Sequence, residues 1–312
     1  MFRLAHLSDP HIAPLPSPSW RQLTNKRLLG YLSWKRRRQH VHRREVLDAV
    51  TRDLQRERPD HTVVTGDLTN IALPAEFDQA ADWLRELGTP ESVSVIPGNH
   101  DASVTVPWAE SLGRIAAYMT SYGETDAAPA SNTHSAAAAF PFLRRCGEVA
   151  LIGLSTALPT PPAFATGKLG SGQIAALEDD LARLGREGLF RCVLLHHPPV
   201  EGAVRARKRL IDAEAFRQAV ARSGAEMILH GHDHRLTRAE IPGPNGPVPV
   251  CGVPSASALA SHGRPAALCQ FYGIGRQDGA WRIDVSARSY CEEKGELKPT
   301  QTRETIRISS RE

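Results

Sequence analysis

Short apolar runs alternate with amphipathic segments along the first 235 residues, and this alternation constrains the fold more than any other feature. His61–Thr65 is rich in β-branched residues, whereas Glu45–Arg56 places its apolar residues at helical spacing. After residue 248 the chain reads as short strands and turns. This order predicts a mixed α/β sandwich, with two sheets packed together and helices outside. The other expected strands are Phe2–Leu7, Val93–Ile96, Val149–Leu154, Val193–Leu195, Met227–Leu229, Val248–Val253, Leu268–Tyr272, Trp281–Ser286 and Thr305–Ile308, and the other expected helices are 74–87, Ile174–Leu184 (capped by Ser171 or Gly172) and Ala213–Ala221.

Length and composition are those of a globular protein with one large domain or two small ones. The chain has 312 residues, of which 41% are hydrophobic and 23% charged, so a sizeable core can form. We expect a single domain over 1–312, with a basic insert at about 12–44, a loop at 127–139 and a strand-rich part from about 248. No run of about 18 apolar residues and no apolar leader is present. The five cysteines are scattered without a CxxC pair, which favours a cytoplasmic location.

Polar side chains that offer oxygen or nitrogen donor atoms follow five of the predicted strands. In open α/β sheets, ligands bind outside the carboxyl ends of the strands, so these five ends could converge on one place. The motifs are Asp9-Pro10-His11, Gly66-Asp67, Gly98-Asn99-His100-Asp101, His196-His197 and Gly231-His232-Asp233-His234.

The side chains in these motifs are carboxylates, imidazoles and an amide, with no thiol. This set suits Mn²⁺, iron, Zn²⁺ or Co²⁺, and it is too large for a single Zn²⁺. Two ions that share a bridge would use it fully. On an extended chain, Asp9 and His11 would point to the same side, as would His232 and His234. The glycines before Asp67, Asn99 and His232 would let the backbone turn without a Cβ clash.

The series of motifs from Asp9 to His234 resembles the calcineurin-like metallophosphoesterases. Within that family the sequence looks like bacterial class III cyclic-nucleotide phosphodiesterases and the enzymes that hydrolyse UDP-2,3-diacylglucosamine in lipid A synthesis. The resemblance implies a four-layer αββα fold and a site for two metal ions, namely Mn, Fe or Zn. The implied metal ligands are Asp9, His11 and His234 for the first ion, Asn99, His196 and His232 for the second, and Asp67 as the bridge.

The resemblance also implies the catalytic residues. His100 would lie beside the substrate, oriented by Asp101, and would steady the transition state or protonate the leaving oxygen. The adjacent His196 and His197 leave open which of the two is the ligand, although the resemblance favours His196. A water bridging two cations loses a proton near neutral pH, so the bridging hydroxide would be the nucleophile.

Three functions remain open at this stage. The first is a phosphodiesterase acting on cyclic nucleotides, and the second is a membrane-associated UDP-2,3-diacylglucosamine pyrophosphatase. The third is a non-catalytic basic adaptor on the same scaffold. Isolated histidines, which are His6, His40, His42, His61, His134 and His262, are expected to be surface or satisfied core residues.

The insert carries most of the positive charge. Residues 21–44 contain nine Lys or Arg and no Asp or Glu, and Leu28, Leu29 and Leu32 would share one face of a helix. The helix could dock on the body with its charges solvated, or it could be a lid or anchor at an anionic membrane surface. Nucleic-acid binding is a third, weaker option. A second basic run, Arg205–Arg209, could clamp a substrate phosphate or be plain surface charge.

Overall fold

Two mixed six-stranded sheets form the centre of the protein, as a computed structural model of residues 1–122, 139–261 and 263–308 describes it. The first sheet has the strand order β12-β11-β10-β1-β2-β3, and the second has β4-β5-β6-β7-β9-β8. The strands are β1 (Phe2–Leu7), β2 (His61–Val64), β3 (Val93–Val95), β4 (Phe142–Cys146), β5 (Val149–Gly153), β6 (Phe190–Leu194), β7 (Met227–His230), β8 (Thr237–Gly243), β9 (Gly246–Gly252), β10 (Leu268–Gln277), β11 (Ala280–Cys291) and β12 (Glu296–Ile308).

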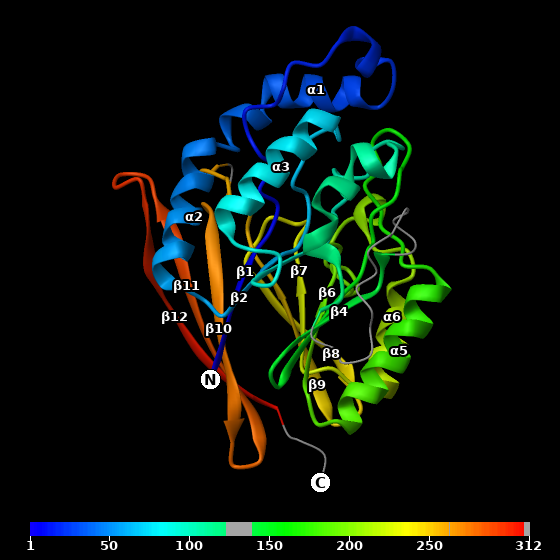
Figure 1. The fold of residues 1–312 in the computed structure, drawn as a ribbon, viewed down its shortest axis with the longest axis vertical. Coiled ribbons are helices and arrows are strands. Elements are labelled where there is room, and N and C mark those ends of the chain that lie inside the picture. Colours follow the sequence, from blue (N-terminus) through cyan, green and yellow to red (C-terminus); the bar gives the residue numbers. More distant parts are fainter. Residues whose placement is uncertain (123–138, 262, 309–312) are drawn as a thin grey trace.

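Helices cover the outer faces of both sheets. Figure 1 shows α2 (Arg44–Glu57) and α3 (Pro74–Leu87) outside the first sheet, and α5 (Ser171–Arg186) and α6 (Ala213–Ser223) outside the second. The expected four-layer αββα sandwich is therefore confirmed. The shorter helical segments are α1 (Arg27–Arg36), η1 (Trp20–Leu23), η2 (Arg38–His40), η3 (Trp108–Glu110), η4 (Leu112–Met119) and η5 (Ala206–Lys208).

The alternation of side chains along β6 and just beyond it explains why the run from Cys192 to Leu195 is apolar without interruption. Phe190, Cys192 and Leu194 belong to the core that the two sheets share. Val193 and Leu195 point to the other side, into the core beneath α5 and α6. A strand that is buried on both faces has no position for a solvated side chain, so it lacks the polar alternation of an exposed sheet.

Most predicted elements are confirmed, with three differences. α5 begins at Ser171 and its N-cap is Gly170, so the prediction that Ser171 or Gly172 caps it is wrong. β4 and β8 were not expected from the sequence, because β4 carries two arginines and β8 contains Pro242. The predicted loop at 127–139 falls, apart from Ala139, outside the described residues, as do His134 and His262.

The strands that precede the five motifs all finish at one end of the molecule. β1, β2 and β3 are parallel neighbours in the first sheet, and β6 and β7 are parallel neighbours in the second. Figure 1 shows α1 lying across this end, opposite the N-terminus. The tail belongs to the same framework, because β10 pairs with β1. This pairing supports a single domain, which stays a prediction. No helix in the described ranges is long and apolar enough to cross a bilayer.

Candidate metal centre

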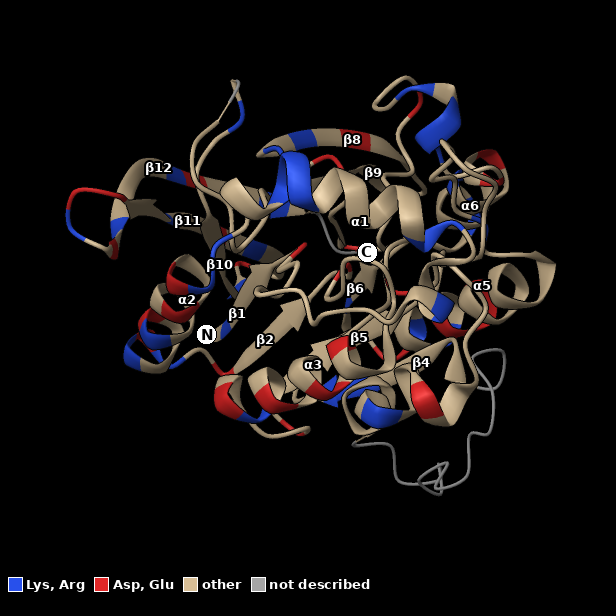
Figure 2. Ribbon diagram, turned by 90° about the horizontal axis from the view of Figure 1, so that it is seen from above, with Lys and Arg blue, Asp and Glu red and all other residues tan. Residues whose placement is uncertain are grey.

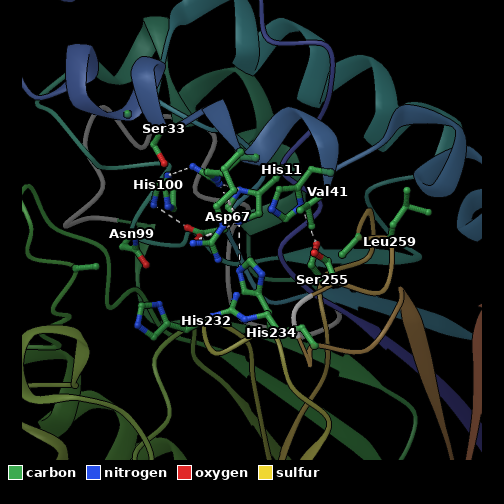
Figure 3. Close-up of a pocket in the computed structure, with 18 of the residues that line it drawn as sticks. His11, Ser33, Val41, Asp67, Asn99, His100, His232, His234, Ser255 and Leu259 are labelled. Atoms are coloured by element: carbon green, nitrogen blue, oxygen red, sulfur yellow. Dashed lines mark hydrogen bonds and ion pairs between the residues drawn. The ribbon is translucent and has the colours of Figure 1, made fainter. Parts of the chain in front are cut away.

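Loops from both sheets bring four of the predicted ligands together. Asp9, His11, Asp67 and His234 each offer one ligand atom within 4.8 Å of the others. His234 Nε2 lies 3.1 Å from Asp9 Oδ1, and His11 Nε2 lies 3.8 Å from Asp67 Oδ2. Figure 3 shows His11, Asp67 and His234 facing one another below the helices of the insert.

A second group of donors also approaches Asp67. His196 Nε2 lies 3.5 Å from Asp67 Oδ2 and 3.3 Å from Asn99 Oδ1. The ring of His232 lies 5.1 Å from the ring of His196, between centroids. Asp67 is thus the residue that both groups share, which is the position expected of a bridging ligand.

Backbone carbonyls fix the tautomers of two of these histidines. His11 Nδ1 donates to Thr69 O at 3.1 Å, and His196 Nδ1 donates to Thr65 O at 2.6 Å. A carbonyl oxygen can only accept, so each Nδ1 carries a proton and each Nε2 is the nitrogen that faces the cluster. Such carbonyl partners orient metal-binding histidines in many proteins.

His197 differs from its neighbour His196. Its Nδ1 lies 2.7 Å from Thr156 Oγ1, and its Nε2 lies 3.2 Å from Ala165 O. Both ring nitrogens of His197 are therefore engaged away from Asp67, whereas His196 directs Nε2 at it.

The donor atoms fit a metal ion. Asp9 Oδ1 and His232 Nε2 are buried and find no hydrogen-bond partner among the described residues, although His234 Nε2 lies 3.1 Å from the former. Buried polar atoms without partners are costly unless something else satisfies them. Carboxylate oxygens, imidazole nitrogens and an amide oxygen are the ligand types that Mn²⁺, iron and Zn²⁺ accept.

Five of the proposed ligands have left-handed backbone conformations, and these conformations, not an extended chain, direct their side chains into the site. Of the nine non-glycine residues with positive φ in the described part, five are Asp9, His11, Asp67, His232 and His234, with φ between 39° and 72°. The expectation that each D-x-H or H-x-H pair converges by lying on an extended strand is therefore wrong. Each such residue is strained, and strain of this kind concentrates at functional sites.

Glycines allow the loops to approach one another closely. A Cβ on Gly98 would lie 2.2 Å from Asp67 Oδ1, and one on Gly231 would lie 1.9 Å from Ser8 Oγ. The predicted need for glycine at these positions is confirmed, although the reason is close packing against a neighbouring loop. At Gly66 the reason is the turn itself, because its φ is 95°.

The electrostatics of the cluster favour bound positive charge. Burial opposes ionisation of Asp9, yet His234 holds the pKa of this carboxyl well below its usual range. Burial likewise opposes charge on His196, but the Asp67 carboxylate outweighs it and raises the pKa of His196 to about 9. The pKa of Asp67 is likewise lowered, by His196 and His100 against the effect of burial, so two buried carboxylates remain charged, and a metal cation could supply the positive charge that they require.

His100 lies at the edge of the cluster but is not oriented by Asp101. Its Nδ1 donates to Asn70 O at 2.6 Å. The Asp101 carboxylate instead accepts hydrogen bonds from the backbone N–H groups of Gly98 and Thr69, at 2.9 and 2.8 Å, and from the Thr69 hydroxyl. The expected contact between Asp101 and His100 is therefore corrected: Asp101 ties two ligand-bearing loops together.

The protonation state of His100 follows from its surroundings. Burial, and after it the Arg38 guanidinium, lowers the pKa of His100 to about 4. With Nδ1 donating to Asn70, the neutral ring presents a lone pair at Nε2.

Sequence reasoning missed two residues of the cavity, Arg38 of the basic insert and His42, which was expected to be a surface or satisfied core residue. Both line a cavity of about 340 Å³ above the cluster. Lys208 lines it too, which favours the phosphate-clamp interpretation of the second basic run over plain surface charge. His42 is buried and its ring lies 4.6 Å from that of His11. No pattern in the sequence separates Arg38 from the arginines beside it.

The helix of the insert is docked through an unexpected face. Arg27 donates to Ile71 O and Ala72 O, and Trp34 is buried. Leu28, Leu29 and Leu32, in contrast, are 43%, 54% and 38% exposed. The docking interpretation is thus supported, but the leucine face is not the face that docks.

The comparisons with known proteins agree with this geometry. The family model for calcineurin-like phosphoesterases matches residues 2–236. A probable cyclic nucleotide phosphodiesterase from a Synechococcus species is 28% identical over 190 residues. That alignment covers 60% of this chain, and the chain spans only 62% of the relative's length.

Solved structures share the fold. A dimetal phosphatase from Danio rerio superimposes with a TM-score of 0.61 at 13% identity and covers 99% of both chains. Purple acid phosphatase PPD1 from yellow lupin seeds gives 0.57 at 14% identity, over 99% of this chain and 53% of that one. At such identities the likeness concerns the fold, whereas the family match rests on three quarters of the sequence. The chain belongs to the calcineurin-like phosphoesterase family.

Proposed function

We propose that the protein is a dinuclear metal-dependent phosphodiesterase. The carrying observation is that both donor groups face Asp67, one through His11 and the other through His196, from two different sheets. The proposed ligands of the first ion are Asp9, His11 and His234, those of the second are Asn99, His196 and His232, and Asp67 is the bridge. His196 is preferred to His197 because only His196 turns a nitrogen toward Asp67.

The bound ions would supply Lewis-acid charge, which activates water as the nucleophile and neutralises phosphoryl oxygens. The protein's own groups then have separate tasks. Thr65 and Thr69 hold the ligand histidines in one tautomer through their carbonyls. His100 presents Nε2 at the cavity edge, where it can contact the substrate, and Asn70 fixes its ring.

A cyclic nucleotide is the first substrate to test. The support is the name of the Synechococcus relative, together with a cavity of about 340 Å³ that combines cationic and apolar lining residues. A nucleotide offers both an anionic phosphoryl group and a flat, weakly polar base, so it matches such a lining.

The experiment is turnover of cyclic AMP by the Mn²⁺-loaded protein, followed by chromatography, beside a UDP-diacylated sugar in detergent and a generic aryl phosphodiester. The Asn99→Ala variant serves as the blank. Cleavage of cyclic AMP that is lost in this variant supports the proposal. If the metal is bound and none of the three compounds is cut, the proposed enzyme activity is refuted. That result would favour a non-catalytic basic adaptor on the same scaffold.

A lipid nucleotide is the second candidate, and the exposed apolar residues of the insert favour it. Trp20 is 74% exposed and Leu29 is 54% exposed, beside the arginines of the same segment. Apolar side chains flanked by Lys and Arg suit an anionic bilayer surface. Co-sedimentation with anionic vesicles, reduced when Leu28 and Leu29 are changed to Ser, would favour this candidate, whereas absence of vesicle binding would count against it.

A further inference from the structure

The basic insert delivers one arginine to the metal centre. α1 ends at Arg36, and after Arg37 the chain turns into η2, which begins at Arg38. Arg38 Nη2 lies 2.8 Å from Nδ1 and 3.2 Å from Nε2 of His11, and Nη1 lies 3.3 Å from His100 Nδ1. Arg38 therefore touches both a proposed ligand and the proposed substrate-facing histidine.

These contacts leave the guanidinium without a partner of opposite charge. The Nδ1 atoms of His11 and His100 already donate to Thr69 O and Asn70 O, so they cannot also accept from Arg38. Similar distances to both nitrogens of His11 place Nη2 over the face of that ring. No ion pair among the residues that the structure describes includes Arg38. Its donors remain available to an anion in the cavity.

Contacts on both sides of Arg38 hold it in place. Before it, Gly30 packs so closely on Ile71 that a Cβ would lie 2.6 Å from Ile71 Cγ2. After it, Leu259 N donates to Val41 O at 2.9 Å, and Arg43 N donates to Ser257 O at 2.9 Å. The insert is thus attached to the body at both ends of the η2 turn, so little conformational entropy remains to be lost when Arg38 binds a ligand.

The cavity around Arg38 has the lining that a phosphate ester requires. Arg37, Arg38, Lys208 and Arg264 line it, and Asp67 is its only carboxylate among the described residues. Val41 and Leu259 form part of its apolar side (Figure 3). Figure 2, seen from above, shows α1 crossing this end of the molecule with its basic residues and without acidic ones.

We propose that Arg38, which lies between His11 and His100 at the metal centre, binds the phosphoryl oxygens of the substrate. This inference rests on the proposed function, because it takes the metal centre as the place where the phosphoryl group lies. An arginine presents a planar fork that matches two phosphoryl oxygens, whereas a lysine presents a single point charge. Arg38 would then add protein-borne positive charge that the five strand-end motifs do not provide.

The test compares Arg38→Met and Arg38→Lys with Arg36→Met. Arg36 is the matched control, because it is an exposed arginine at the end of α1 that does not line the cavity. Three quantities are measured on Mn²⁺-loaded protein: binding of inorganic phosphate by calorimetry, metal content, and kcat/KM for an aryl phosphodiester. We expect Arg38→Met to weaken phosphate binding about tenfold or more and to lower kcat/KM about 10²–10³-fold, with metal content retained. Arg38→Lys should recover part of both losses, and Arg36→Met should match the wild type.

The outcomes separate this proposal from the proposed function. Wild-type phosphate affinity in Arg38→Met would overturn the role of Arg38, even if the enzyme is active. Loss of metal from Arg38→Met and Arg38→Lys alike would also overturn it, since Arg38 would then support His11. If the wild type hydrolyses nothing, yet binds phosphate in an Arg38-dependent manner, the proposed function fails and the proposal for Arg38 stands.

Discussion

Replacing Asp101 tests whether this carboxylate holds loops together or orients His100. Its oxygens accept from Gly98 N at 2.9 Å, from Thr69 N at 2.8 Å and from Thr69 Oγ1 at 2.9 Å, and Asp101 is 3% exposed. In Asp101→Ala the backbone N–H groups of Gly98, Thr69 and Leu68 lose this acceptor, whereas the Thr69 hydroxyl can still donate to His100 O. At about 1 kcal/mol for each, the lower end of the usual range, the free energy of unfolding should fall by about 3 kcal/mol. Asp101→Asn, which keeps one acceptor oxygen, should lose about half as much.

The assay is urea unfolding of chelated protein, so that bound metal does not contribute, followed by metal content after reloading. We expect both variants to be destabilised and to retain less metal, because the loops carrying Asp67 and Asn99 are no longer tied together. His100→Ala serves as the comparison. If Asp101→Ala unfolds at the wild-type urea concentration, keeps its metal and matches His100→Ala in kcat/KM, the loop-tying argument is refuted.

Three further predictions concern acid stability, the insert and the metal ligands. Burial is the main cause that lowers the pKa of His61 to about 3, so between pH 6.5 and pH 3 the unfolded chain binds a proton that the folded protein does not. The free energy of unfolding should therefore fall by about 2 kcal/mol between pH 7.5 and pH 5 through this residue, and that part of the slope should vanish in His61→Gln. Gly30→Val should lift α1 from the body and speed tryptic cleavage between residues 26 and 38, whereas Leu32→Val, at an exposed site, should not; equal cleavage rates would contradict the docking described. Added Mn²⁺ should raise the melting temperature of chelated wild type and of His197→Gln by similar amounts, and that of His196→Gln by less, because this variant keeps only the ligands of the first ion; the reverse order would exchange the two histidines.

Local sequence was sufficient to predict the strands and helices whose periodicity is strong. β1 and α3 have the bounds that the pattern predicted, because a largely buried strand and an amphipathic helix each leave a clear pattern in the sequence. β4 was missed because one of its arginines, Arg144, is buried. Arg144 donates to Val93 O at 2.9 Å and to Ala117 O at 2.8 Å, and neither partner is near it in sequence. Such a strand forms because of contacts with residues far away in the sequence, and the local sequence pattern does not reveal those contacts.

The same division holds for the site. The predicted ligands stand directly after strands, so the order of the motifs was enough to expect that they meet. Arg38 and His42 reach the cavity only because the insert folds back over it, through contacts such as those of His42 Nδ1 with the hydroxyls of Ser257 and Ser255 at 3.0 and 3.2 Å. Those partners lie more than 200 residues away. A basic run looks the same in sequence whether its arginines meet solvent or a ligand.

The position of β1 has a consequence for synthesis on the ribosome. β1 is made first, but in the finished sheet it lies between β2 and β10, and β10 begins only at Leu268. Every proposed ligand has been translated once His234 emerges, while the strand that carries Asp9 and His11 at its end still has an open edge. Open edges pair readily with other chains. A nascent chain that stalls between His234 and Leu268 would thus hold all the donor atoms but remain prone to aggregate, until β10 covers the open edge of β1 and β11 and β12 extend the first sheet.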